Sequence, residues 1–369
     1  MSGLTMLGPV VLAGTARPGE AREVALADVK TWDIVLARDA IPSERYAAEE
    51  LQRFLEQATG VELPIVAEAR EGARRVFVGP GAVRQAGDLC FDTGEFGPED
   101  LRVVVRDTGI AIAGGRPRGT LYGVYTFLED VLGVRFLTPD HTHVPQLPPD
   151  ARFPPMDKMY RTPLRFRWSH YGELVEDHVF ATRMKTNTVQ DEDWLGGKTP
   201  IGLIGHTFGH LMPWAKYGEE HPEYYNEIGG ERPKDIWNDQ YSPGVQLCAS
   251  HPDVVRIVTE AVLRDLEENR GRGNISVSQN DNDRYCQCER CRAIDEQAGS
   301  PMGSLLTMVN TVADAVAEKH PGVMVGTLAY AYSCKPPVGI RPRANVQIQL
   351  CSIGCCQTHP ITDADCPLN

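Results

Sequence analysis

The feature that most constrains the fold of this 369-residue chain is an alternation of short apolar segments with amphipathic segments over residues 161–369. The amphipathic segments 254–266 and 305–317 predict helices. Strands that alternate with helices form parallel βαβ units. The strands are expected at residues 164–168, 185–189, 202–205, 274–278, 323–331 and 346–350. This α/β pattern predicts a (β/α)₈ TIM-type barrel that is incomplete at its C-terminus, although an open doubly wound sheet fits the same number of strands.

Residues 25–145 predict a smaller α+β domain that precedes the barrel. This region contains short strand-like segments, a hairpin signal at Asp107-Thr108-Gly109, and two amphipathic helices that end near Gly60 and Gly133. Five prolines between residues 145 and 155 predict a stiff linker, because proline restricts the backbone. We therefore place the linker at residues 146–160 and the partial barrel domain at residues 161–369.

The charge of the chain disfavours one class of partner. Asp and Glu together number 50 and Lys and Arg number 37, which gives a net charge of −13. Such a chain repels a phosphate backbone, so no nucleic-acid partner is expected. No apolar run reaches the roughly 18 residues of a membrane span. No basic residue precedes Arg17, so a secretory signal is not recognisable, and a cytoplasmic location is expected if Met1 is the true start.

Polar and aromatic residues follow every expected strand of the second domain. Ligands of parallel α/β domains bind at the C-terminal ends of the strands. Carboxylates and amides hydrogen-bond sugar hydroxyls, and aromatic faces stack on sugar rings. The sequence therefore predicts an oligosaccharide or glycan substrate. The expected substrate contacts are Trp168, His206, His210, Asn280, Asn282, Tyr330, Tyr332 and His359.

His206 and His210 also have the spacing of two metal ligands on one helical face. No Glu follows His206, so the metalloprotease motif is absent. We favour hydrogen bonds from these two side chains to the substrate, and a structural histidine pair is the alternative.

The cysteines give a separate signal. The run Cys286-Gln-Cys288-Glu-Arg-Cys291 contains the Cys-x-x-Cys spacing of a zinc knuckle. A complete site needs further ligands, for which the later residues Cys351, Cys355, Cys356, His359 and Cys366 are candidates. A structural metal, disulfides and free thiols all remain open, and the expected chemistry itself requires no cofactor.

Two parts of the chain resemble known families. Residues 43–60, 114–129 and 133–136 are similar to the small N-terminal domain of α-glucuronidases and β-N-acetylhexosaminidases, which precedes a catalytic barrel. The second half resembles the domain of unknown function numbered 4838, which includes the endo-β-N-acetylglucosaminidases of glycoside hydrolase family 163. The motifs that carry this second resemblance are His206-Thr-Phe-Gly-His210, His221-Pro-Glu-Tyr224, Gln246-Leu-Cys248, Ser276-Val-Ser-Gln-Asn-Asp281, Cys286-Gln-Cys288 and residues 351–369.

The resemblance implies a glycoside hydrolase that acts on a glycan containing N-acetylhexosamine or uronic acid. In hexosaminidases an Asp-Glu pair ends the fourth barrel strand; the Asp orients the acetamido group and the Glu is the general acid. Asp281 stands at the position of that Asp, but Asn282 follows it. We therefore expect carboxylate general acid/base chemistry from Asp281, with Asp283 as a second candidate. The resemblance also implies carboxylates from later strands, so we expect the chain to be a fragment of a longer protein. The alternatives are a non-catalytic carbohydrate-binding protein and a Cys-ligated metal protein.

Overall fold

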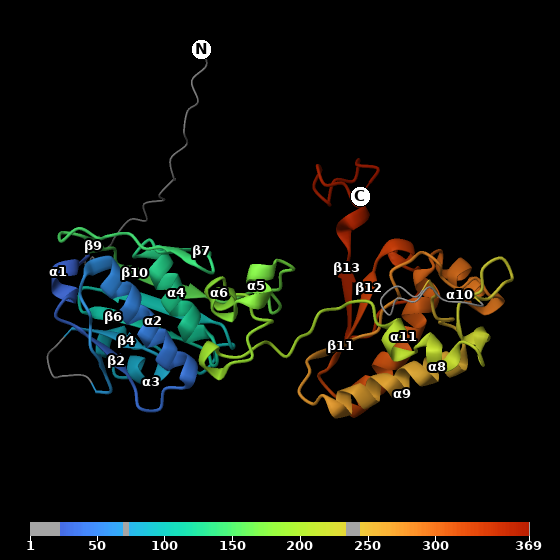
Figure 1. The fold of residues 1–369 in the computed structure, drawn as a ribbon, viewed down its shortest axis with the longest axis horizontal. Helices are drawn as coiled ribbons and strands as arrows, with labels where there is room; N and C mark the ends of the chain where they lie inside the picture. The colour runs from blue at the N-terminus through green and yellow to red at the C-terminus, as the bar shows by residue number, and fades with distance from the viewer. Residues whose placement is uncertain (1–22, 69–73, 234–243, 369) are drawn as a thin grey trace, which may run out of the picture. The chain divides into compact units, whose positions relative to one another are not determined.

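The computed structural model describes residues 23–68, 74–233 and 244–368. The chain divides into two compact units, which meet in sequence at Thr199 and Pro200. Both units combine helices with strands, so the expected mixed α/β composition is confirmed (Figure 1). Within the described residues, no helix combines the length and the apolar character that crossing a membrane requires.

The first unit contains a six-stranded sheet with the order β10-β5-β6-β4-β2-β3. Strands β2, β3, β4 and β6 are parallel, whereas β5 runs antiparallel to both β6 and β10. The bounds are β2 (Asp33–Leu36), β3 (Ile65–Val66), β4 (Arg75–Val78), β5 (Leu101–Arg106), β6 (Gly109–Gly114) and β10 (Met156–Tyr160).

Alternate residues of these strands enter two apolar cores, one on each face of the sheet. Ile34 and Ile110 belong to the larger core, where helices α2 (Pro42–Thr59) and α4 (Gly119–Asp130) pack. Val35 and Ala111 belong to the smaller core on the other face, beside helix α3 (Pro80–Val83). This period of two is what a sheet buried on both faces requires.

The proline-rich segment is part of the first unit. Strand β10 pairs with β5 from Met156↔Val105 to Tyr160↔Leu101, and β9 (Arg152–Phe153) pairs with β1 (Val24–Ala25). The linker expected at residues 146–160 is therefore corrected, because its second half completes an edge of the sheet. Proline is tolerated at such edges and strand starts.

Residues 161–199 also belong to the first unit, in contrast to the expected domain start at residue 161. The buried carboxylate of Glu99 explains this, because it accepts hydrogen bonds from Arg118 Nε and Asn187 Nδ2, both at 2.8 Å. Its other oxygen lies 2.6 Å from a guanidinium nitrogen of Arg167. The strands expected at 164–168 and 185–189 are absent from the described structure, and short helices α5 (Gly172–Glu176) and α6 (His178–Arg183) lie between them.

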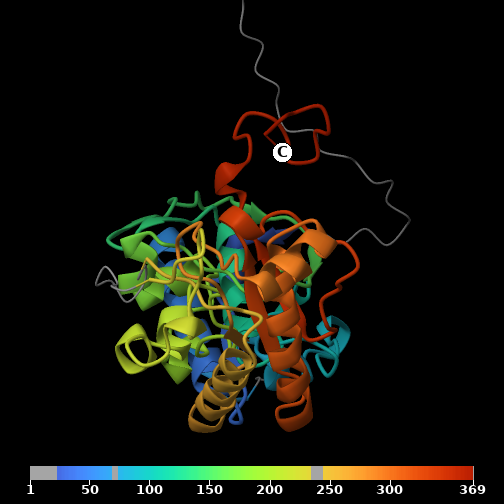
Figure 2. The same ribbon diagram turned by 90° about the vertical axis from the view of Figure 1, so that its right-hand side faces the viewer.

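The second unit contains a parallel three-stranded sheet with the order β11-β12-β13. These strands are β11 (Asn274–Ser276), β12 (Met324–Ala329) and β13 (Val346–Leu350), which confirms three of the expected parallel strands. Helices α9 (Pro252–Glu268) and α11 (Met302–Lys319) pack beside the sheet and appear as neighbouring gold and orange helices in Figure 2. Among the described residues these strands form an open sheet and not a closed barrel.

The strand expected at 202–205 is replaced by an extended segment beside β11. Asn274 uses its side chain to bond both the N–H and the C=O of Gly202, at 2.7 and 2.9 Å. The Ser276 hydroxyl does the same for Gly205, at 3.2 and 2.7 Å. Because side chains occupy these backbone groups, the segment lacks the regular ladder of a strand. Ile204 packs over Gly326 of β12, where a Cβ would lie 2.5 Å from Ile204 Cγ1.

Candidate functional site

The candidate site lies at the carboxyl edge of the three-stranded sheet. The chain leaves β11 and reaches Asp281, and it leaves β12 at Tyr330. The Tyr330 hydroxyl donates a hydrogen bond to Asp281 Oδ1 at 2.8 Å. Parallel strands present their C-terminal ends at the same edge, so the pairing of β11 with β12 brings these two residues together.

His206 completes this group from the extended segment beside β11. Its Nδ1 lies 2.6 Å from the carbonyl oxygen of Gln279, and a carbonyl oxygen only accepts, so Nδ1 carries the proton. Nε2 then faces Asp281 Oδ1 at 3.9 Å. The hydrogen bond of one ring nitrogen to the backbone thus presents the other nitrogen to the carboxyl group.

The group is open to a ligand. The side chain of Asp281 is 52% exposed and that of His206 is 26% exposed. The hydrogen bond to Asp281 raises the pKa of Tyr330, with a smaller contribution from burial. Tyr330 therefore remains a protonated donor at neutral pH. The arrangement presents a carboxyl group, an imidazole nitrogen and a phenol to solvent within one small area.

The side chain of Gln246 holds the polar loop that carries Asp281. The Asn280 N–H donates to Gln246 Oε1 at 3.0 Å, and Gln246 Nε2 donates to the carbonyl oxygens of Asn280 and Asn282 at 2.9 and 3.0 Å. The side chain of Asn280 is buried, where it donates to Val245 O at 2.8 Å and accepts from the Gly209 N–H at 3.0 Å.

The two asparagines predicted as substrate contacts therefore have another role. Asn280 is saturated by protein partners, and Asn282 Oδ1 accepts from Gln246 Nε2 and from the Arg284 N–H, each at 3.0 Å. Asn280 is buried and Asn282 is half-buried, and both amides hold the loop in place. Their role as sugar contacts stays a prediction. Sequence reasoning missed Gln246, whose only signal was the Gln246-Leu-Cys248 motif.

The remaining predicted contacts lie on different elements of the structure. Helix α7 (Phe208–Leu211) begins after Thr207, so His210 lies on it and is exposed, whereas His206 precedes it. The two imidazoles therefore do not share a helical face, because the helix is a single turn that starts too late. Trp168 belongs to the first unit, where its ring lies 3.8 Å from that of His170.

Tyr332 and Asp283 lie on the same loops as Tyr330 and Asp281. The ring of half-buried Tyr332 lies 5.2 Å from that of Tyr285, and burial raises its pKa, with a further contribution from the carboxylates of Asp295 and Asp283. Asp283 itself is exposed. His359 belongs to a different group of side chains: its Nδ1 lies 3.4 Å from the Cys356 sulfur, and Cys366 completes a cluster with them.

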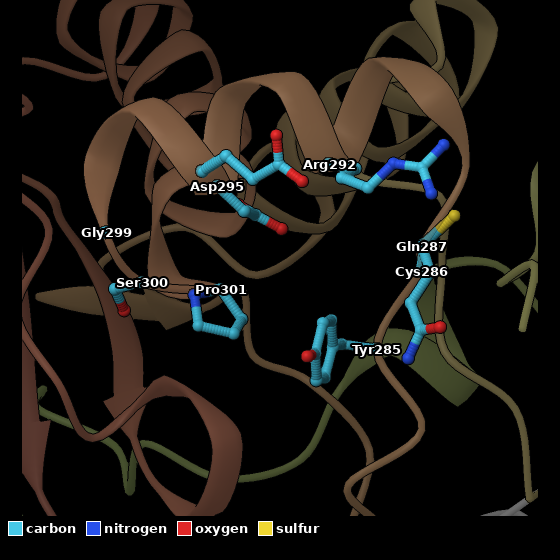
Figure 3. Close-up of a pocket in the computed structure, with 9 residues that line it drawn as sticks. Tyr285, Cys286, Gln287, Arg292, Asp295, Gly299, Ser300 and Pro301 are labelled. Atoms are coloured by element: carbon cyan, nitrogen blue, oxygen red, sulfur yellow. The ribbon is translucent and has the colours of Figure 1, made fainter.

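A pocket of about 450 Å³ lies along helix α10 (Glu289–Ala298). Figure 3 shows Asp295 and Arg292 on the helix, with Tyr285 and Pro301 facing them across the hollow. Burial raises the pKa of Asp295 to about 6, although its carboxylate accepts a hydrogen bond of 2.7 Å from the Ser304 N–H. No motif in the sequence predicted this pocket.

Four cysteine sulfurs gather beside the same helix. The predicted metal candidates Cys286, Cys288 and Cys291 are joined by Cys248, and all four are buried. Their sulfurs lie within 4.8 Å of one another. Cys248 was missed, since it is distant in sequence and stands alone there. These four residues are a set of ligands that could hold a metal ion.

Comparison with protein families places the chain. The model of the Domain of unknown function (DUF4838) matches residues 136–367, which is more than half of the sequence. The chain belongs to the DUF4838 family. No curated protein matches the DUF4838 chain.

Several solved glycosidases resemble the DUF4838 chain weakly. The N-acetyl-β-hexosaminidase of Streptomyces plicatus has a TM-score of 0.46 and 14% identity, and the match covers 92% of this chain and 68% of that one. The β-N-acetylhexosaminidase of Bacteroides fragilis has a TM-score of 0.46 and 11% identity, with 90% and 68% covered. A family GH115 4-O-methyl-α-glucuronidase with specificity for decorated arabinogalactans has a TM-score of 0.42 and 13% identity, with 86% and 44% covered.

Proposed function

We propose that the DUF4838 protein is a glycoside hydrolase that acts on a glycan containing N-acetylhexosamine or uronic acid. Asp281 is its catalytic carboxylate in this proposal. The observation that carries it is the exposed Asp281 carboxyl group, which lies between the Tyr330 hydroxyl at 2.8 Å and His206 Nε2 at 3.9 Å. The position at the carboxyl edge of a parallel sheet is where such folds bind ligands.

The proposed chemistry is general acid/base catalysis. The Asp281 carboxyl group gives its proton to the glycosidic oxygen while the bond from that oxygen to the anomeric carbon breaks. Water then adds to the anomeric carbon, and its proton returns to the Asp281 carboxylate. His206 Nε2 faces Asp281 Oδ1 at 3.9 Å, because the other ring nitrogen is bound to the Gln279 carbonyl. Asp283, two residues further along the exposed loop, is the candidate for a second carboxylate.

We propose in addition that the second unit is part of a (β/α)₈ barrel, like the barrel that follows the N-terminal domain of α-glucuronidases and β-N-acetylhexosaminidases. The support is the parallel order β11-β12-β13 with helices α9 and α11 packed beside it. His210, Tyr332 and Trp168 remain proposed sugar contacts.

The test is release of reducing sugar from a panel of N-acetylhexosamine and uronic-acid glycans. We expect Asp281→Asn to lower the rate by ~10²–10⁴-fold, because it removes the proton donor and keeps the shape. Asp314→Asn is a matched control, since Asp314 is exposed on α11 and forms a surface ion pair with Arg343. Equal background release by the wild type and both variants contradicts hydrolysis.

A second candidate function is carbohydrate binding without turnover. One observation favours it: Asn282 follows Asp281 in place of an acidic residue, and its Oδ1 is bound to Gln246 and Arg284. Calorimetric titration with the same glycans separates the two candidates. Binding by both the wild type and Asp281→Asn, without release of sugar, supports a binding protein.

A further inference from the structure

We propose that Cys248, Cys286, Cys288 and Cys291 bind a structural zinc ion. All four side chains are buried, with exposed fractions of 0%, 5%, 6% and 0% in that order. They form a buried cluster of their own, distinct from the apolar core of the second unit. The proposal stands apart from the proposed hydrolysis and does not require it.

The spacing of the sulfurs fits a tetrahedral zinc site. Sulfurs at the usual Zn–S length of about 2.3 Å, on the corners of a tetrahedron, lie about 3.8 Å apart. Cys248 Sγ lies 3.6 Å from Cys288 Sγ and 3.8 Å from Cys291 Sγ, and all four sulfurs lie within 4.8 Å of one another. A disulfide needs about 2.05 Å between two sulfurs. One sulfur cannot pair with three neighbours, but one ion can bind all four.

The sequence around the cluster has the features of a zinc knuckle. Cys288 is the N-cap of α10 and Cys291 lies in its first turn, so both cysteines of the Cys-x-x-Cys pair lie at the start of one helix. The Glu227 N–H donates to Cys286 Sγ at 3.4 Å, and the Ser250 hydroxyl lies 3.0 Å from Cys291 Sγ. Donors of this kind stabilise metal-bound thiolates. Four protein ligands leave no open position, which is typical of a structural zinc site.

The ion would join two distant segments of the second unit. Cys248 lies just before α9, and the other three ligands lie at the start of α10. Gln246, two residues before Cys248, holds the backbone of Asn280 and Asn282. The zinc site and Gln246 therefore fasten both ends of the loop that carries Asp281. Cys248 acts here as a positioning residue and not as a catalytic one.

The first test is the zinc content of the full chain, expressed with zinc and purified in reducing buffer. We expect Cys248→Ser and Cys291→Ser to hold about one zinc per chain less than the wild type. Cys334→Ser is the matched control, because Cys334 is exposed in the same unit, and it should keep the wild-type content. The difference from wild type separates this site from the Cys356, His359 and Cys366 cluster. Equal zinc in all four proteins, or iron in place of zinc, overturns the proposal.

A second test needs no variant, in case loss of a ligand prevents folding. The wild-type protein is stripped with a chelator under reducing conditions, divided, and alkylated with or without added zinc. We expect zinc to protect the four cluster cysteines and to leave Cys334 and Cys90 equally labelled, since both are exposed. If zinc does not reduce the labelling of the four cysteines, the proposal is overturned. Cobalt added in place of zinc should give thiolate-to-metal absorption in the near ultraviolet.

Discussion

Gln246 bonds both backbone groups of Asn280: its Oε1 accepts from the Asn280 N–H at 3.0 Å, and its Nε2 donates to the Asn280 carbonyl at 2.9 Å. All of these atoms belong to buried residues. One side chain therefore substitutes for a strand partner at the point where the chain turns toward Asp281. This contact is the basis of the first prediction.

Gln246→Ala should destabilise the protein by about 2–3 kcal/mol, because it leaves buried backbone groups without partners. Chemical denaturation measures this change in the free energy of unfolding. Gln347→Ala is the control, since Gln347 is exposed on β13 and should change the free energy by less than about 0.5 kcal/mol. Equal effects of the two substitutions would show that the Gln246 contacts do not hold the loop.

Asp281→Asn should lower the pKa of Tyr330. The hydrogen bond and the negative charge of Asp281 both favour the neutral phenol, and the amide removes the charge. The phenolate absorbance measured over an alkaline pH series reports the change, with Tyr330→Phe identifying the contribution of that residue. An unchanged Tyr330 titration contradicts the 2.8 Å contact between the two side chains.

Asp295→Asn should reduce the pH dependence of stability. Burial raises the pKa of Asp295 to about 6 in the folded protein. The unfolded chain releases this proton at lower pH, near about 4, so the contribution of Asp295 to stability falls as pH rises between about 4 and about 6. The asparagine cannot ionise, and its Oδ1 can still accept from the Ser304 N–H.

The free energy of unfolding of Asp295→Asn, relative to that of the wild type, should therefore increase by about 1–2 kcal/mol as pH rises across this range, after allowance for partial solvent screening. Thermal or denaturant unfolding at a series of pH values measures it. Asp265→Asn is a control at a surface ion pair with Arg272. A difference that stays constant with pH contradicts the raised pKa.

Gly326→Ala should destabilise the second unit by about 1–3 kcal/mol, because the new methyl group meets Ile204 at 2.5 Å. Ile204→Ala in the same protein should recover part of the loss by removing the clash. Gly354→Ala is the matched control, since a Cβ there meets nothing within 4 Å. Failure of the second substitution to recover any stability would place the 201–207 segment away from β12.

The sequence predicted the parts of the fold that depend on local periodicity. Helix α9 carries Val254, Val258 and Val262 on one buried face, so its pattern alone indicates it. The three parallel strands also followed from alternation with helices. From their register, the meeting of Asp281 with Tyr330 could be expected, because both residues follow the ends of neighbouring strands.

The remaining features depend on contacts between residues that are distant in sequence. Residues 185–189 look like a strand, but Lys185 has a positive φ of 58° and Asn187 is bound to buried Glu99. The boundary at Thr199 follows from the same buried carboxylate and not from the prolines. Gln246 and Cys248 reach the site through contacts with residues 280–291, which are distant in sequence and which no local periodicity predicts.

The hydrogen bond from His206 Nδ1 to the Gln279 carbonyl has one more consequence. Gln279 lies two residues before Asp281, so the backbone segment that carries the carboxyl group also orients the imidazole. Thermal displacement of that stretch carries both members along together. A shift of this backbone segment is therefore expected to change the distance between the carboxyl group and the imidazole less than an independent movement of either group would.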